Sequence, residues 1–364
     1  MPSLPRFPAL LGLPLWSLLT PALAASLLLL GNHISSGWPW LTVVALGLIA
    51  TVLVAVFHAE VVAHRVGEPF GTLVLALAVT IIEVSLIVSM MLSGGEASSE
   101  LARDTVFATV MIICNGVVGL CLLAGAWRHR IISFRVQGAG SALSVLTALT
   151  TLTLVLPKFT TTTSGPTYSS SQLAFAGLMS LVLYGVFVFV QTVRHREFFV
   201  SDSSDPEEQH PVAPGGTLLS LGMLGLALVA VVGLAKQLSP FIQHTVEKAS
   251  APAAVVGIAI ALLVLLPETG AALRAALRNR MQTSLNLALG SALATIGLTI
   301  PSVAVVAIYL NLPLVLGLSP KELVLLALTL LASAITLAGG QATVLQGAVH
   351  LVIFAAFLFL AIVP

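Results

Sequence analysis

The sequence predicts an all-α polytopic membrane protein with about 11 transmembrane helices, one leading helix plus two inverted five-helix repeats. Three observations predict this class. Of the 364 residues, 58% are hydrophobic and only 8% are charged, and the mean hydropathy of +1.08 is too high for a water-soluble domain. The apolar runs are long and continuous, which favours helices over an outer-membrane barrel. With the leading helix set aside, five helices precede a central polar segment and five follow it, and an odd number in each half gives the halves opposite orientations in a bilayer.

Apolar stretches of membrane-spanning length, separated by Gly, Pro or charged residues, define the expected helices. They lie at about 9–30, 38–57, 71–92, 104–126, 139–157, 173–193, 216–235, 252–273, 285–310, 322–339 and 342–363. Only Gly339 and Gly340 divide the last two, so ten helices remain the alternative. The first stretch follows Arg6 and contains ALAAS, as cleavable signal peptides do, but its apolar run continues to Leu30, so we expect a retained helix.

The polar segment that follows Arg194 divides the chain. We expect a leading transmembrane helix in residues 1–35, a first five-helix repeat in 36–193, an acidic cytoplasmic linker in 194–215 and a second five-helix repeat in 216–364. The linker contains DSSDPEEQH and no apolar run that could bury itself, which is typical of a solvated tether. An acidic sensor of cations or pH is the alternative.

Basic residues indicate the orientation, because cytoplasmic loops carry an excess of Lys and Arg. With the N-terminus inside, ten of the 15 basic residues fall on the cytoplasmic side. These ten are Arg6, Arg65, Arg128, Arg130, Arg135, Arg194, Arg196, Arg274, Arg278 and Arg280. The outer side holds Arg103, Lys158, Lys236, Lys248 and Lys321. We therefore expect a multi-pass protein with a cytoplasmic N-terminus.

Two carboxylates lie near the middle of expected membrane helices, Glu83 in 71–92 and Glu268 in 252–273. An ionised acid at this depth costs roughly 2.5 to 3.5 kcal/mol on insertion scales, so it usually faces a bundle interior or a wet cavity on a substrate path. Each acid lies in the second helix of its five-helix group, and inverted symmetry would bring them together. Each can hold a proton or help to coordinate a cation. The alternative is a buried acid that hydrogen-bonds a neighbouring helix.

The neighbours of the two acids are candidate ligands. Thr80 lies one turn before Glu83 and should share its helix face. Pro267, just before Glu268, has no amide hydrogen, so we expect a kink or break that leaves backbone carbonyls available to a cation. The alternative for Thr80 is a hydroxyl that hydrogen-bonds back to its own helix, and the alternative for Pro267 is a kink that serves packing only.

Further polar residues inside the expected helices are candidates for the lining of a cation path. They are Asn115, Asn286, Ser291, Thr295 and Thr299. The last three recur every four residues and so share one helix face. Hydrogen bonds between helices explain these residues equally well. His350 is expected to be a core histidine with its own partners, and Cys114 and Cys121 are expected to be small core residues rather than a disulfide or metal site.

Several long motifs carry a resemblance to a known family. They are HAEVVAHRVGEPFGTLVLALAVTIIEVSLI, RDTVFATVMI, YGVFVFVQT and LLPETGAALRAALRNRMQTSLNLALGSALATIGLTIP. In these segments the chain resembles the bacterial calcium/proton antiporters of the cation/calcium exchanger superfamily, and most closely the sodium-potassium/proton antiporters of enterobacteria. The resemblance implies a leading helix, two inverted five-helix repeats and residence in the bacterial inner (plasma) membrane.

The resemblance also assigns roles to particular residues. It implies that Glu83 and Glu268 form the shared cation and proton site, and that the acid at Glu60, near His58 and His64, is a cytoplasmic proton entry. Related calcium exchangers carry a Gly-Asn pair ahead of each acid. Here Val79 and Thr80 precede Glu83, and Val264 and Leu265 precede Glu268. The departure removes an amide ligand from each repeat and weakens the case for calcium selectivity.

The function expected from these observations is secondary active antiport, in which Ca²⁺, Na⁺ or K⁺ leaves the cytoplasm in exchange for protons by alternating access around the two acids. A passive cation channel is the alternative. The sequence has no HExxH, GxSxG or phosphate-loop motif, so we expect neither an enzyme nor a bound cofactor. The expected partners are the lipid bilayer, inorganic cations and protons, without nucleic acid. The sequence leaves the oligomeric state open.

Overall fold

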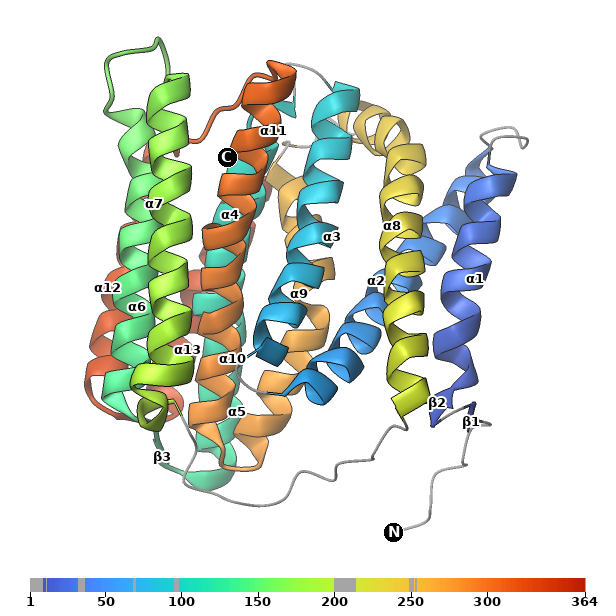
Figure 1. Ribbon diagram of the computed structural model, residues 1–364. Helices are drawn as coiled ribbons and strands as arrows, with labels where there is room; N and C mark the ends of the chain where they lie inside the picture. Colours follow the sequence, from blue (N-terminus) through green and yellow to red (C-terminus); the bar gives the residue numbers. More distant parts are fainter. Residues whose placement is uncertain are drawn as a thin grey trace. The chain divides into compact units, whose positions relative to one another are not determined.

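The computed structural model describes residues 9–10, 12–31, 37–67, 70–94, 98–199, 214–248, 252 and 254–363, and these are almost entirely helical (Figure 1). Within them, ten helices are long and apolar enough to cross a membrane, and α1 is a shorter apolar helix. The predicted all-α membrane class is confirmed, and the helix count agrees with the prediction of about 11. Most of the acidic linker, residues 200–213, lies outside the described residues.

The first half of the chain contributes the helices up to the linker. They are α1 (Leu15–Leu30), α2 (Trp38–Val66), α3 (Phe70–Gly94), α4 (Leu101–Met111), η2 (Ile112–Val117), α5 (Val118–His129), α6 (Val136–Thr150), η3 (Thr151–Val155), η4 (Leu156–Lys158), α7 (Ser170–Phe189), η5 (Val190–Arg194) and η6 (Arg196–Phe198). The second half contributes α8 (Pro214–Lys248), α9 (Ala254–Leu277), α10 (Met281–Ala294), η7 (Thr295–Thr299), α11 (Ile300–Leu310), α12 (Pro320–Ala338) and α13 (Val344–Ile362).

Strands are short in the described part of the chain. β1 (Ala9–Leu10) pairs with β2 (Leu13–Pro14), and β3 (Ile132–Ser133) pairs antiparallel with β4 (Gln341–Ala342). The second pair joins the loop after α5 to the loop before α13, and the Phe134 amide extends it by donating to the Gly340 carbonyl at 2.9 Å.

The helix starts follow from local sequence. Capping boxes open α7, α12 and α13, where Ser169, Ser319 and Thr343 each lie three residues before a Gln or Glu. The break between α12 and α13 falls at the glycine pair that the sequence indicated, and Gly340 has a φ of 64°, which favours glycine. These are therefore two helices and not one.

Several expected single helices contain a wide turn. The expected spans 104–126, 139–157, 173–193 and 285–310 each contain or end in a π-helical segment, namely η2, η3, η5 and η7 in the described residues. Such turns shift backbone hydrogen bonds from the fourth to the fifth residue back, and they often mark functional sites.

The chain packs as two compact units, and each combines segments from both sides of the linker. Unit 1 is formed by residues 1–93 and 205–245 and contains α1, α2, α3 and most of α8. Unit 2 is formed by residues 94–204 and 246–364 and contains α4 to α7 and α9 to α13.

In unit 1 a buried histidine joins three helices. His58 of α2 is fully buried, and its Nδ1 lies 3.1 Å from Ser220 Oγ of α8 while its Nε2 lies 2.8 Å from the Ser17 carbonyl of α1. Gln237 of α8 donates to the Leu28 carbonyl near the end of α1 at 3.1 Å. The leading helix is thus tied to α2 and α8 near both of its ends.

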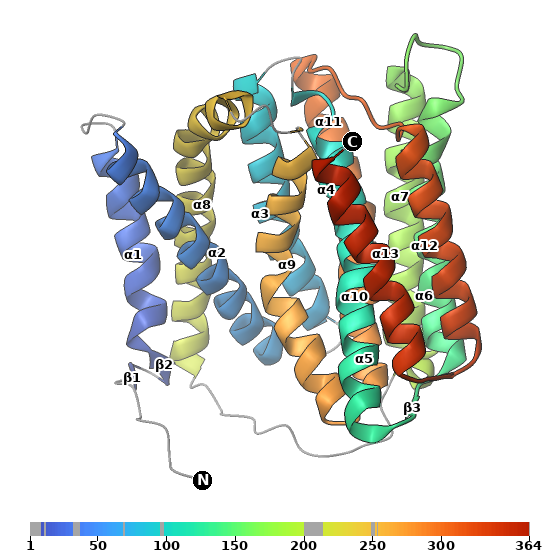
Figure 2. The ribbon, with the colours of Figure 1, turned by 180° about the vertical axis from the view of Figure 1, so that it is seen from behind.

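Unit 2 contains the larger apolar core, in which α13 lies along α5 (Figure 2). The two backbones approach closely at Gly347. A Cβ atom added there would lie only 2.5 Å from the Leu123 amide nitrogen. The chain between α11 and α12 is extended, and three of its amides bind backbone carbonyls elsewhere in the unit. Val315 donates to Ser99, Gly317 to Pro166 and Leu318 to Leu154, each at 3.0 Å.

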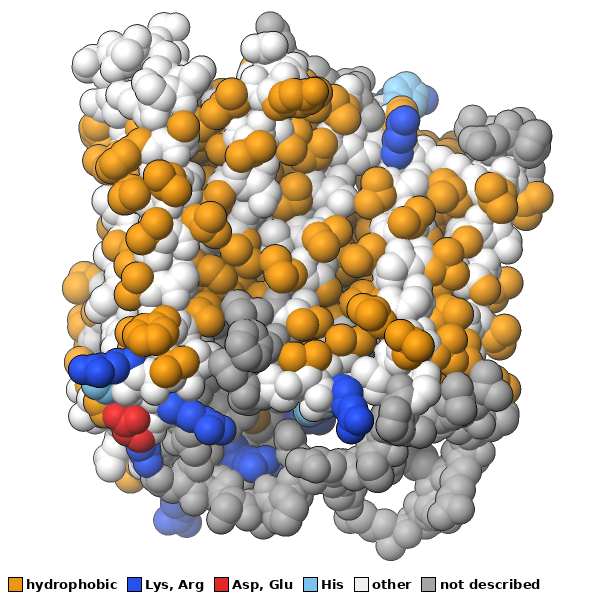
Figure 3. Space-filling view, viewed as in Figure 1, with side chains coloured by type: hydrophobic (Ala, Val, Ile, Leu, Met, Phe, Trp, Pro, Cys, Tyr) orange, Lys and Arg blue, Asp and Glu red, His pale blue; other side chains and the backbone are white. Residues whose placement is uncertain are grey.

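The ends of unit 2 differ in charge. Where α5, η5 and α9 end, arginines are exposed, and Figure 3 shows basic side chains gathered at the lower end of the view, below apolar surface. The exposed arginines at these helix ends are Arg128, Arg130, Arg194, Arg274 and Arg278. His129 Nε2 lies 3.0 Å from the Leu277 carbonyl, which brings the ends of α5 and α9 together.

Candidate cation and proton site

Glu83 lies on the packed face of α3. Its side chain is only 1% exposed. One turn away on either side, Thr80 and Ile87 are also buried, whereas Leu77 and Ile81 on the opposite face are exposed. The helix therefore turns the carboxylate and the predicted Thr80 hydroxyl to the same buried side, away from its exposed face.

Glu268 lies in α9 of unit 2, and its side chain is half-buried. The helix continues through Pro267 from Ala254 to Leu277, so the predicted break is absent. Pro267 has no amide hydrogen, and this position cannot supply the usual donor to the Leu263 carbonyl. The Thr269 hydroxyl donates back to the Leu265 carbonyl at 2.7 Å, as buried threonines in helices often do.

Asn115 lies inside η2, and both the nitrogen and the oxygen of its side-chain amide have hydrogen-bond partners. Its Nδ2 donates to Thr329 Oγ1 of α12 at 2.9 Å, and its Oδ1 lies 3.2 Å from His350 Nδ1 of α13. The other imidazole nitrogen of His350 lies 3.1 Å from Thr336 Oγ1. These contacts favour the hydrogen-bonding interpretation of Asn115 over that of a cation ligand, and they agree with a core role for His350.

Asn286, near the start of α10, binds the chain that follows η6 through hydrogen bonds. Its Nδ2 donates to the Phe199 carbonyl just after η6, and its Oδ1 accepts from Gln282 Nε2 at 2.8 Å. Gln282 Oε1 in turn accepts the Arg135 amide at 2.7 Å. The pair of amides therefore anchors the segment that leads into the linker.

The rest of the predicted polar set lies further along the same transmembrane segment. Thr295 and Thr299 are buried in η7, and Ser291 is half-buried in α10. Close packing surrounds this turn, because a Cβ on Gly297 would lie 2.5 Å from Tyr184 Cβ of α7. In unit 1, Glu60 is half-buried in the last two turns of α2, His58 is buried between three helices, and His64 is exposed.

The cysteines agree with the expectation. Cys114 and Cys121 are both buried and free. Among the described residues, no group of three or more His, Cys, Asp or Glu side chains could hold a metal ion.

A charged cluster at the opposite end of unit 2 from the arginines was missed by the sequence interpretation. Arg103 and Asp104 lie in the first turn of α4 and are buried, and Glu100 precedes them. Arg103 Nη2 lies 2.8 Å from Asp104 Oδ1 and 2.9 Å from Glu100 Oε2. The adjacent opposite charges of RDTVFATVMI, at the start of an apolar run, are the signal that could have revealed it.

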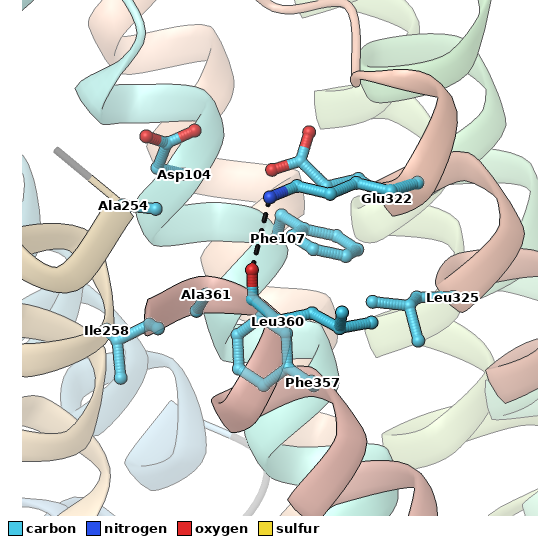
Figure 4. Close-up of a pocket in the computed structure, with 10 residues that line it drawn as sticks. Asp104, Phe107, Ala254, Ile258, Glu322, Leu325, Phe357, Leu360 and Ala361 are labelled. Atoms are coloured by element: carbon cyan, nitrogen blue, oxygen red, sulfur yellow. Dashed lines mark hydrogen bonds between the residues drawn. The ribbon is translucent and has the colours of Figure 1, made fainter. Parts of the chain in front are cut away.

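An open pocket lies beside this cluster (Figure 4). It encloses about 370 Å³ of empty space, part of it open to solvent. The carboxylates of Asp104 and Glu322 lie on one side, and the ring of Phe357 lies on the other. Lys321 also lines the pocket, and its Nζ donates to the Leu360 carbonyl at 3.1 Å. The pocket brings together the starts of α4, α9 and α12 and the end of α13.

Sequence comparisons give consistent matches over most of the chain. The family described as "Sodium/calcium exchanger protein" matches residues 36–193 and 219–363. The "Putative ionic transporter y4hA" of Sinorhizobium fredii (strain NBRC 101917 / NGR234) is 49% identical over 356 residues, which are 96% of this chain and 97% of that protein. The "Sodium-potassium/proton antiporter ChaA" of Escherichia coli (strain K12) is 35% identical over 319 residues, 86% of each chain.

Solved structures share the fold. Native YfkE has a TM-score of 0.71 at 18% identity and covers 96% of this chain and 100% of its own. The H⁺/Ca²⁺ exchanger CAX has a TM-score of 0.67 at 14% identity, with 94% of this chain and 88% of its own covered. At these identities the likeness concerns the architecture of the helices.

Proposed function

Because the chain belongs to the sodium/calcium exchanger protein family, we propose that it is a secondary active antiporter that exports Ca²⁺, Na⁺ or K⁺ in exchange for protons. The relatives are named as a transporter and an antiporter and not as enzymes, which supports a transport function for this chain. The observation that carries the proposal is the burial of Glu83, at 1% exposed, in a helix of membrane-spanning length. A carboxylate at this depth is costly and is usually retained for transport.

The second acid supports the same interpretation. Glu268 lies in the second membrane span of the matched segment 219–363, as Glu83 does in the matched segment 36–193. In an inverted repeat, equivalent positions converge near the middle of the membrane. We therefore assign the cation and the protons to these two carboxylates, with Thr80 as an additional oxygen ligand.

The proposed cycle follows from the chemistry of a carboxylate. Its oxygens bind either a proton or a cation, so a cation that enters the site displaces protons, and protons that enter displace the cation. Alternating access by rocking of the two inverted repeats exposes the acids first to one side and then to the other.

The membrane orientation is also a proposal. In unit 2 the exposed arginines lie at one end, and Arg103 and Lys321 lie at the other. The positive-inside rule then assigns the arginine-rich end of unit 2 to the cytoplasm of a bacterial cell. By the same rule, Arg6 and Arg65 in the sequence assign the N-terminus to the cytoplasm.

The test is a cation series in proteoliposomes that contain a fluorescent pH probe. An antiporter moves protons across the bilayer whenever Ca²⁺, Na⁺ or K⁺ moves the other way, and the ion that gives the largest response at the lowest concentration is the preferred substrate. Cation flux without obligatory proton movement would instead identify a passive channel, and it would overturn the proposal.

A further inference from the structure

The transmembrane helix formed by α4, η2 and α5 contains a wide turn at its centre. The Val118 amide donates to the Ile113 carbonyl, five residues back. In an α-helix it would donate to the Cys114 carbonyl, four residues back. All six residues of η2 are buried. In an apolar interior, the polar groups of such a turn need partners inside the protein.

His350 of α13 contacts this turn. Its side chain is fully buried, and its Nδ1 lies 3.2 Å from Oδ1 of Asn115, which lies inside η2. Oδ1 of Asn115 is a carbonyl oxygen and can only accept, so Nδ1 of His350 carries the proton, while Nδ2 of Asn115 donates to Thr329. Nε2 is then left to accept from the Thr336 hydroxyl, 3.1 Å away. A neutral imidazole in this tautomer satisfies every contact.

The backbones around His350 are in close contact, so the ring has a fixed position. A Cβ on Gly119 of α5 would lie 2.9 Å from His350 Cβ. Thr329 and Thr336, which bind Asn115 and His350, lie two turns apart on α12. The wide turn is thus held from α12 and α13 together.

On another side, the same transmembrane helix contacts α9, which carries Glu268. A Cβ on Gly257 of α9 would lie 2.9 Å from both the Asp104 carbonyl carbon and the Thr105 amide nitrogen. Further along, α9 also packs against η2 and α5. A change in the course of the helix at its wide turn would therefore be transmitted to α9.

We propose that His350 is a positioning residue for transport: it holds the wide turn around Cys114 and Asn115, and through this turn it sets the position of α9 and its Glu268 carboxylate. The inference rests on the proposed role of Glu268 as a ligand. It predicts that His350 affects how well the cation binds more than how fast the loaded protein turns over.

The experiment compares His350→Leu with His350→Gln, whose side-chain amide can both donate and accept. Two readouts are measured on purified protein in proteoliposomes: cation concentration dependence of exchange, and labelling of the native cysteines by N-ethylmaleimide, resolved by mass spectrometry. Cys114 lies in the wide turn, and Cys121 is an internal reference two turns later. His244→Leu, at an exposed histidine of α8, is the control for loss of an imidazole.

We expect His350→Leu to weaken apparent cation affinity roughly tenfold with a maximal rate within about twofold of the parent, since loss of one buried hydrogen-bond partner acts on this scale. Labelling should rise at Cys114 more than at Cys121. His350→Gln should recover most of both properties, and His244→Leu should change neither. Thr336→Val, which removes only the Nε2 partner, should act in the same direction more weakly, and it provides a second test if His350→Leu does not fold.

Two results would overturn the inference. Unchanged labelling at Cys114 in His350→Leu and Thr336→Val would show that the wide turn holds without the imidazole. Increased labelling with unchanged cation affinity would show that the turn does not position Glu268. Failure of the proposed function is distinguishable, because Glu268→Gln would then retain full exchange whatever the behaviour of His350.

Discussion

Arg103 and Asp104, neighbours in the sequence, form a buried ion pair in the first turn of α4, with 2.8 Å between Nη2 and Oδ1. Arg103 also donates through Nε to the same oxygen at 2.9 Å, and through Nη1 to the Gly317 carbonyl at 3.4 Å. The guanidinium therefore ties the start of α4 to the extended chain before α12, and it compensates a carboxylate that is 4% exposed.

Removal of Arg103 should destabilise unit 2 more than removal of both charges. Arg103→Leu leaves Asp104 buried without its cation, and breaking a buried pair in this way costs about 3 to 5 kcal/mol. We expect a marked fall in the thermal unfolding temperature of Arg103→Leu in detergent. The double variant Arg103→Leu with Asp104→Asn should recover part of the loss, because it removes the uncompensated charge.

Arg103→Lys is the matched control, since it keeps the charge and loses the fork geometry, so its stability should lie between those of the parent and Arg103→Leu. If the parent and all of these variants unfolded at the same temperature, the cluster would contribute nothing to the stability of the fold.

Gly347 should tolerate no side chain. A Cβ there would lie 2.5 Å from the Leu123 amide nitrogen and 2.8 Å from its Cα, and backbone atoms cannot move aside without separating α13 from α5. Gly347→Ala should therefore lower the unfolding temperature, by an amount that corresponds to about 1 to 3 kcal/mol for overpacking. Gly185→Ala in α7 is the control, because no atom lies within 4 Å of its added methyl group. A neutral Gly347→Ala would show that the two helices can separate at no cost.

Hydropathy predicted which segments cross the membrane, because the bilayer imposes the same length and apolarity on every spanning helix. It also predicted the separation of α12 from α13, since Gly339 and Gly340 interrupt the last apolar run. The buried positions of Cys114 and Cys121 follow from the same reasoning, because small apolar side chains in such a run pack readily.

Hydropathy could not predict which residues far apart in the sequence contact each other in the fold. His58 and Ser220 are separated by 162 residues, and Asn115 and His350 by 235, and nothing in the local sequence links them. No composition signal marks the wide turn at η2, whose Asn115 has partners in α12 and α13. The single position Asn115 was therefore compatible with a pathway or with a hydrogen bond, and only its neighbours in space distinguish the two.

The two central acids should be indispensable for exchange. Glu83→Gln and Glu268→Gln keep the shape of each side chain and remove its ionisable group, so each variant should insert and fold normally while coupled cation and proton flux falls to background. Glu197→Gln, at an exposed acid near the start of the linker, is the control and should transport normally. Full exchange by either central variant would exclude the two-carboxylate site.

The acidic linker should be dispensable if it is a solvated tether. Neutralisation of Asp202, Asp205, Glu207 and Glu208 to Asn or Gln should then leave the maximal rate and its pH profile unaltered. The measurement is exchange in everted vesicles at several pH values and calcium concentrations. A shift in activation by pH or calcium would establish the linker as a sensor and contradict the tether interpretation.

Protons and the cation should compete for Glu83 and Glu268, because the same carboxylate oxygens bind both. As pH rises, fewer protons occupy the acids, so apparent cation affinity should tighten and then level off once both are ionised. If both acids release a proton for one divalent cation, the cycle is electroneutral; a monovalent cation exchanged for two protons would respond to voltage by about 2.3 kcal/mol per 100 mV. The measurement is cation affinity in proteoliposomes across a pH series, with the membrane potential clamped by an ionophore. An affinity independent of pH throughout the active range would rule out a shared site, and it would direct the search for the proton route to Glu60.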